Sequence, residues 1–231
     1  MTDRQAELSA NLDAVHQRIA MAATAAGRQS SDIGLVVVTK FFPASDVRLL
    51  AGLGVTDVGE NRHQEAEAKA ADCADLELVW HFIGGLQTNK AAAVARYAGI
   101  VESVDRPELL PRLSRGAAER EKMLDVLLQV SLDRAEHRSG VSPDDLPALA
   151  EQTVATEHLR LRGLMAVAPL GEDPAAAFGR LAAIREGFLR EHPDAGILSA
   201  GMSGDLEQAI FAGATHVRVG SAVLGSRPQV K

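Results

Sequence analysis

The sequence predicts an α/β protein, a closed (β/α)8 TIM barrel with an extra helix at its N-terminus. Short runs rich in β-branched residues alternate with runs rich in Ala, Leu and charged residues along almost the whole chain. This alternation is typical of parallel strands joined by helical crossovers. Eight such units in 231 residues fit a barrel better than an open sheet. The first strand is also not followed by the G-x-G-x-x-G of a dinucleotide fold.

The first predicted element is an amphipathic helix that ends at Gly27. Thr2 and Gln5 have the spacing of a capping box at its start. Apolar residues then recur with helical spacing at Leu8, Leu12, Val15 and Ile19. This helix therefore has one apolar face and precedes the first strand.

The remaining elements follow in regular order. Strands are expected at residues 33–39, 55–59, 78–83, 100–104, 124–131, 161–167, 195–200 and 216–219. Helices are expected at residues 44–53, 62–74, 89–97, 107–120, 143–156, 174–192 and 205–212. No linker, low-complexity tract or change of composition divides the chain, so we expect one domain over residues 1–231.

Composition narrows the range of functions. With 24 Lys+Arg against 31 Asp+Glu and a formal charge of −7, the chain has no basic run that could follow a nucleic acid backbone. The one cysteine, Cys73, cannot form an intrachain disulfide. The acidic N-terminus does not resemble a signal peptide, and no apolar run is long enough to span a bilayer. We expect a cytoplasmic protein without a nucleic acid, membrane or metal partner.

The functional face of such a barrel is formed by the carboxyl ends of its strands. Side-chain alternation along the strands directs Lys40, His81 and Arg218 inward, although a lysine there could instead reach solvent along an apolar stem. A buried arginine is costly without a partner, so Arg218 should have an acceptor. The candidate residues at this face are Lys40, Asn61, His81, Met165, Ser199, Met202, Ser203, Gly204, Arg218, Gly220 and Ser221.

The segments MSGDLEQAI and VGSAVLG indicate an anion site. Each places Ser and Gly between a late strand and a following helix, where backbone N–H groups and the helix dipole favour an anion. Ser203 or Ser221 alone could simply cap a helix, but together on adjacent loops they predict a phosphate cradle. A phosphate cradle beside Lys40 and Arg218 suits pyridoxal 5′-phosphate (PLP), which needs an amine, phosphate donors and a partner for its ring nitrogen.

Several longer blocks resemble the pyridoxal phosphate homeostasis protein family, which is related to the N-terminal domain of alanine racemases. They read VVVTKFFPASDV, DVGENRHQEAEAK, WHFIGGLQTNK, RSGV, LRGLMAVAP and SAGMSGDLEQAIFAGATHVRVGSAVLGSRP, and extend from about Ile33 to Pro228. The resemblance implies a fold type III PLP-binding barrel that holds PLP as a reversible Schiff base on Lys40. It also implies a part in intracellular PLP homeostasis without established catalytic turnover, so no catalytic residue is assigned.

The resemblance also assigns roles to the other candidates. It places the phosphate on Ser203, Gly204, Gly220 and Ser221 and the ring nitrogen on Arg218. Asn61, His81, Met165, Ser199 and Met202 match positions that line the cofactor pocket. Two positions depart from the family: Phe42 and Arg138 stand where relatives often carry lysines, and neither side chain can form a Schiff base.

Two other functions remain open from the sequence. A PLP-dependent amino-acid racemase is favoured by Arg218, which alanine racemases share, but the chain ends just after the barrel and its only tyrosine, Tyr97, is expected to be packing. A barrel for another phosphorylated metabolite would use Lys40 only as a charge. PLP-dependent apoenzymes are candidate partners, and because nothing in the sequence demands a dimer, we expect a monomer.

Overall fold

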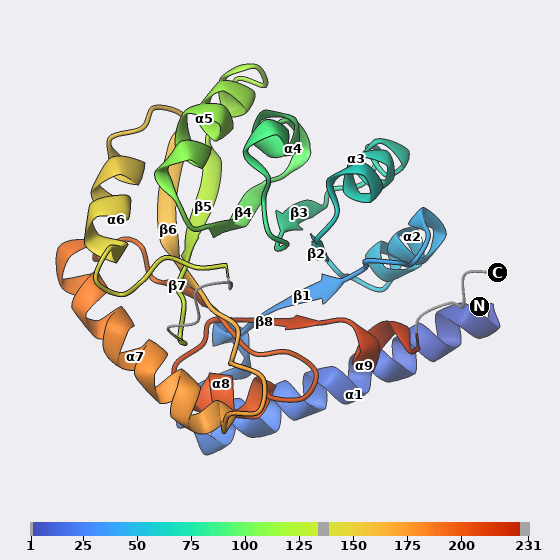
Figure 1. Ribbon diagram of the computed structural model, residues 1–231. Coiled ribbons are helices and arrows are strands. Elements are labelled where there is room, and N and C mark those ends of the chain that lie inside the picture. The colour runs from blue at the N-terminus through green and yellow to red at the C-terminus, as the bar shows by residue number, and fades with distance from the viewer. Residues whose placement is uncertain (1, 134–138, 227–231) are drawn as a thin grey trace.

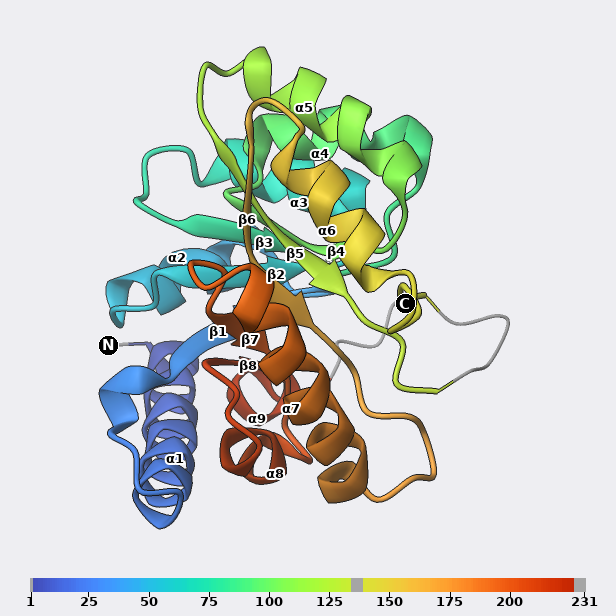
Figure 2. The ribbon, with the colours of Figure 1, turned by 90° about the vertical axis from the view of Figure 1, so that its left-hand side faces the viewer.

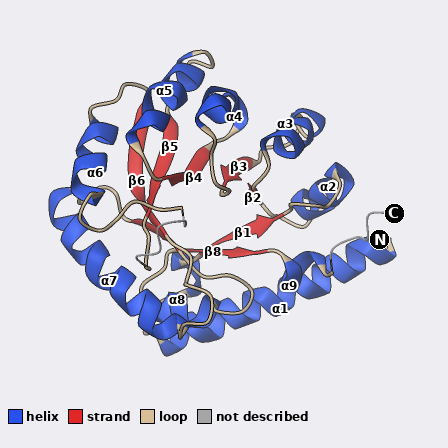
Figure 3. Ribbon diagram, in the orientation of Figure 1, coloured by secondary structure: helices blue, strands red, loops and turns tan. Residues whose placement is uncertain are grey.

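The eight strands form a closed parallel barrel in sequence order, with the last strand pairing back to the first. The structure, a computed structural model, describes residues 2–133 and 139–226, so Arg138 lies outside the described residues. Figure 1 shows the helices arranged around the strands, and Figure 3 shows the same separation of inner strands from outer helices. The predicted fold class is confirmed.

All eight predicted strands are present. They are β1 (Gly34–Val38), β2 (Asp57–Glu60), β3 (Val79–Phe82), β4 (Ile100–Val104), β5 (Leu124–Gln129), β6 (Leu159–Met165), β7 (Ile197–Ser199) and β8 (His216–Val219). The predicted range 161–167 was wrong by two residues at each end. Strand β6 begins earlier because Leu159 and Arg160 pair with Leu124 and Asp125 of β5.

The predicted helices are also present. They are α1 (Asp3–Ala25), α2 (Ala44–Gly52), α3 (His63–Asp72), α4 (Ala91–Tyr97), α5 (Leu110–Ala118), α6 (Leu146–Val154), α7 (Pro174–Glu191) and α8 (Leu206–Phe211). Short 3-10 turns η2 (Thr88–Lys90) and η3 (Pro107–Leu109) form the beginnings of two predicted helices. The turn η1 (Ser30–Asp32) and the one-turn helix α9 (Ser221–Leu224) lie outside the predicted ranges. No helix in the described part of the chain is long and apolar enough to cross a membrane.

Helix α1 covers the side of the barrel where β8 meets β1. The Thr2 hydroxyl accepts a hydrogen bond from the Gln5 N–H at 3.2 Å, which caps the helix as its sequence predicted. Its apolar face, including Leu8, packs with Val37 of β1 and Val217 of β8. Figures 1 and 2 show α1 lying alongside α8 and α9, which it also contacts.

The apolar core lies between the strands and the helices. Its largest cluster fills the space between β3–β7 and α4–α7, and a second lies beneath α1, α8 and α9. Trp80 packs with Val47 and Cys73, and Phe82 belongs to the largest cluster. With both aromatic rings outside the barrel, His81 between them points into it, as side-chain alternation predicted.

Candidate functional site

A pocket of about 280 Å³ opens at the carboxyl ends of β1 and β8. Its volume is close to the lower limit for small-molecule sites, about 300 Å³. Seven predicted site residues line it: Lys40, Met202, Ser203, Gly204, Arg218, Gly220 and Ser221. Val38, Phe41, Phe42, Ile83 and Gly225 complete the lining. The pocket therefore combines two cations, two hydroxyls and an apolar wall, without a carboxylate among these residues.

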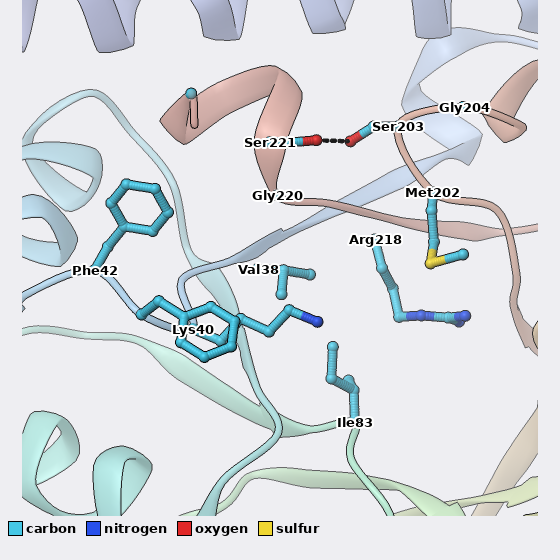
Figure 4. A pocket seen from close by; sticks show the side chains of 12 residues that line it. Val38, Lys40, Phe42, Ile83, Met202, Ser203, Gly204, Arg218, Gly220 and Ser221 are labelled. Atoms are coloured by element: carbon cyan, nitrogen blue, oxygen red, sulfur yellow. Dashed lines mark hydrogen bonds between the residues drawn. The ribbon is translucent and has the colours of Figure 1, made fainter. Parts of the chain in front are cut away.

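Lys40 lies two residues beyond the end of β1, and its side chain extends into the pocket (Figure 4). Figure 4 shows its nitrogen between Val38 and Ile83, on the side of the pocket that also holds the Arg218 guanidinium. Phe42 is 8% exposed, and its ring belongs to the apolar cluster beneath α1. Lys40 is thus directed inward, whereas Phe42 serves packing.

Ser203 and Ser221 lie on neighbouring loops, and the Ser221 hydroxyl donates to that of Ser203 at 3.4 Å. Neither caps a helix, because the N-caps of α8 and α9 are Asp205 and Gly220. Gly220 lies close to β1: a Cβ added to it would come within 3.2 Å of the Val38 carbonyl oxygen. The two loops therefore bring these hydroxyls together at the pocket.

Helix α1 supports both of these loops from outside. The Arg18 guanidinium donates to the Ser203 carbonyl oxygen at 3.0 Å and forms an ion pair with Glu207 at 2.8 Å. Asn11 donates to the Val223 carbonyl oxygen at 2.9 Å, and Arg4 to that of Leu224 at 3.1 Å. The N-terminal helix thus positions the two loops as well as covering the barrel.

Arg218 forms part of the pocket and is almost completely buried. It donates to the Ser199 hydroxyl at 2.7 Å and to the Ala166 carbonyl oxygen at 2.9 Å, so the expected acceptors are present. The carboxylate of Glu102 lies 3.7 Å from the same guanidinium. Burial lowers the pKa of Arg218 and Glu102 opposes that effect, and an arginine stays protonated at neutral pH. Because a guanidinium has five N–H donors, it retains donors for a ligand.

A chain of polar groups continues from Arg218 into the barrel. The Ser199 hydroxyl donates to Glu102 at 2.6 Å, and the other Glu102 oxygen lies 2.7 Å from His81 Nδ1. The opposite nitrogen of His81 lies 2.9 Å from Asp57. A neutral imidazole has one N–H and can donate to only one carboxylate, so contacts on both sides favour the imidazolium.

The pKa values follow from this arrangement. Burial alone would lower the pKa of His81, but its hydrogen bonds with Asp57 and Glu102 raise it to about 9. Burial alone would raise the pKa of each carboxyl, and the contact with His81 lowers it instead. Charge therefore alternates from Asp57 through His81 and Glu102 to Arg218 at the pocket.

The remaining predicted residues do not line this pocket. Met165 and Ser199 are buried within the barrel wall, and His81 lies in the interior. Asn61 borders a neighbouring cavity of about 310 Å³ instead. No role was predicted for Asp57 or Glu102, although a glutamate inside the β-branched run IVESV is a signal of an inward polar group.

Comparison with known proteins identifies the family. A family model described as alanine racemase, N-terminal domain, matches residues 10–228. A pyridoxal phosphate homeostasis protein from Mycobacterium leprae is 42% identical over 96% of this chain and 94% of its own length. One from Pseudomonas aeruginosa is 44% identical over 95% of this chain and 96% of its own. The chain belongs to the pyridoxal phosphate homeostasis protein family.

Solved structures agree with membership in this family. PipY of Synechococcus elongatus, solved with PLP bound, has a TM-score of 0.79 and 35% identity, covering 90% of this chain and 100% of its own. Alanine racemase from Corynebacterium glutamicum has a TM-score of 0.61 at 17% identity over 95% of this chain and 64% of its own, which is a likeness of fold. The sequence resemblance to the pyridoxal phosphate homeostasis protein family is confirmed.

Proposed function

We propose that this protein binds PLP covalently and reversibly through Lys40 and contributes to PLP homeostasis. One observation carries the proposal: an inward lysine, an inward arginine and a pair of facing hydroxyls line one pocket. Relatives named pyridoxal phosphate homeostasis proteins and the PLP-bound PipY structure support the same ligand.

The residues present fit this ligand chemically. PLP supplies an aldehyde that condenses reversibly with a primary amine and releases water. Lys40 provides the amine, and Arg218 provides a donor for the ring nitrogen. Ser203 and Ser221, with the backbone around Gly204 and Gly220, provide donors for the phosphate. The two cations in the pocket also favour an anionic ligand.

We further propose that binding, without turnover of amino acids, is the function. An arginine donates to the ring nitrogen and disfavours its protonation, which weakens the ring as an electron acceptor. Racemisation by two bases would also need a second acid or base at the ligand. Tyr97 is not among the pocket residues: its ring stacks on His63 outside the barrel, and burial raises its pKa.

The test is covalent labelling. Incubation with PLP followed by borohydride reduction should fix one PLP per chain on the peptide that contains Lys40, and Lys40→Ala should abolish this labelling. Lys90→Ala is the matched control, because Lys90 borders the neighbouring cavity. Equal labelling of Lys40→Ala would refute the proposed attachment site.

A second measurement distinguishes binding from catalysis. A racemase would exchange the Cα hydrogen of free amino acids with solvent deuterium at an enzymatic rate, and we expect no such exchange. If no covalent adduct forms at all, the protein instead fits a barrel for another phosphorylated metabolite.

We also propose that the protein is a single-domain, cytoplasmic monomer, and that PLP-dependent apoenzymes are candidate partners.

A further inference from the structure

The backbone that carries Lys40 has an unusual conformation. Phe41, the next residue, has a φ of 72°, in the left-handed region that residues with a side chain rarely adopt. Such a conformation persists only where surrounding contacts hold it in place. The contacts that do so here come from α3, on the outer side of the barrel.

Two side chains of α3 bind the peptide units on either side of Lys40. The Phe41 N–H donates to the Glu65 carboxylate at 2.6 Å, and the Lys69 ammonium donates to the Thr39 carbonyl oxygen at 2.8 Å. The Thr39 carbonyl and the Phe41 N–H belong to the two peptide planes that meet at the Lys40 Cα. Fixing both planes fixes the direction of the Cα–Cβ bond from which the Lys40 side chain extends.

Lys69 is itself held in place. It is 6% exposed, and its ammonium also donates to Glu60 at 2.7 Å and to Glu65 at 2.7 Å. The Thr39 hydroxyl donates to the same Glu60 oxygen at 2.6 Å. An ammonium has three N–H donors, and here Thr39, Glu60 and Glu65 accept all three. Lys69 is therefore a buried cation with a structural task rather than a second amine for a ligand.

Two arginine–phenylalanine contacts and a backbone hydrogen bond also hold this turn. The Arg62 guanidinium, just before α3, lies 5.0 Å from the centre of the Phe41 ring. The Phe42 N–H donates to the Thr39 carbonyl oxygen at 3.1 Å, and Arg4 lies 5.7 Å from the Phe42 ring. Both phenylalanines that follow Lys40 are thus held by these contacts, and they also border the pocket into which Lys40 extends.

We propose that Glu65 and Lys69 are positioning residues, which hold the Thr39–Phe41 turn so that the Lys40 amine reaches a ligand in the pocket. This inference rests on the proposed function, since it concerns the amine that would attach to PLP. The two residues bind the peptide groups on either side of Lys40 and are not among the residues that line the pocket. Their loss should therefore affect covalent attachment more than recognition of the phosphate.

The experiment compares two ligands that differ at one group. Binding of PLP, measured from the absorbance of the covalently bound form, depends on both Lys40 and the phosphate loops. Binding of pyridoxine 5′-phosphate, which has an alcohol in place of the aldehyde, depends on the loops and Arg218 but not on covalent attachment to Lys40. For Glu65→Ala we expect PLP affinity to fall about tenfold, while pyridoxine 5′-phosphate affinity stays at its wild-type value.

Two further variants sharpen the comparison. In Glu65→Gln the amide oxygen can still accept from the Phe41 N–H, so most of the lost PLP affinity should return. Glu67→Ala is the matched control: Glu67 lies on the same helix with an exposed side chain, and PLP affinity should not change. Thermal unfolding of the three ligand-free variants checks that each is folded.

The outcomes separate this inference from the proposed function. If the wild-type protein forms no covalent adduct with PLP, the proposed function is refuted and the inference with it. If the wild type forms the adduct but Glu65→Ala binds PLP as tightly as Glu67→Ala, only the inference is overturned. An equal loss of affinity for both ligands in Glu65→Ala would also overturn it, since that would indicate general damage to the barrel.

Discussion

The imidazolium of His81 should make the stability of this protein depend on pH in a defined direction. Its pKa is about 9 in the folded protein, against 6.5 for an ordinary histidine. A group whose folded pKa is raised contributes stability that is complete below the unfolded pKa and is lost as pH rises through the folded value. The His81 contribution is therefore present near pH 6.5 and almost absent near pH 9.5.

The size of the effect follows from the two pKa values. At about 1.4 kcal/mol for each pH unit between them, the difference from 6.5 to about 9 corresponds to about 3–4 kcal/mol, most of which is lost between about pH 6.5 and 9.5. This is a substantial part of a typical unfolding free energy of about 5–15 kcal/mol. The structural source is the pair of contacts, at 2.7 Å to Glu102 and 2.9 Å to Asp57, that the imidazolium makes inside the barrel.

Urea unfolding at several pH values between about 6.5 and 9.5 tests this reasoning in the wild type and in His81→Gln. The wild type should lose about 3 kcal/mol over this interval, and the variant should begin less stable and lose much less. His16→Gln is the control, since His16 is exposed on α1. Other groups whose pKa differs between the folded and unfolded chain, such as the Cys73 thiol, whose pKa is raised by burial, affect all three proteins alike. Parallel curves for the wild type and His81→Gln would refute a charged His81.

Two further substitutions test the packing of the barrel. Gly163→Ala should lower the unfolding free energy in urea by at least about 3 kcal/mol, because Gly163 has φ 151° and an added Cβ would lie 1.9 Å from the Ile197 carbonyl oxygen. Gly179→Ala, in open space on α7, should instead add up to about 1 kcal/mol, and equal effects would refute the steric argument. Phe42→Lys should lower the unfolding free energy by roughly 3–5 kcal/mol in the same assay, because Phe42 is buried. It should not add a second borohydride-reducible PLP site. Phe211→Lys is the control and should have little effect, since the Phe211 side chain on α8 is 60% exposed. A stable Phe42→Lys protein that binds two PLP would contradict the packing role of Phe42.

Much of the fold could be predicted because its signals are local. Each strand is a short β-branched run, and the alternation of side chains along it is fixed by backbone geometry. This is why the inward direction of Lys40, His81 and Arg218 followed from the sequence alone. The start of β6 could not be predicted from the sequence alone. Pairing with β5, and not the local composition, decides where that strand begins.

The supporting residues of the site could not be predicted in the same way. Asp57 and Glu102 meet His81 only because β2, β3 and β4 pair in a particular register. Glu65 and Lys69 have ordinary helical spacing, and an ion pair four residues apart usually indicates an exposed helix surface. Only the packing of α3 against the end of β1 turns that pair into a contact with the backbone of Lys40.

The two cations of the pocket are therefore held by separate sets of buried polar contacts. Lys40 is fixed from outside the barrel by α3, whereas Arg218 is fixed from inside it through Ser199 and Glu102. The two sets share no residue, and groups without shared partners usually contribute independently. Arg218 has a counter-charge in Glu102, because a buried charge without one is costly. The barrel interior is therefore polar along the chain of hydrogen-bonded side chains that ends at Arg218. Placing the buried guanidinium of Arg218 at the pocket requires acceptors inside the barrel, and Ser199 and Glu102 supply them.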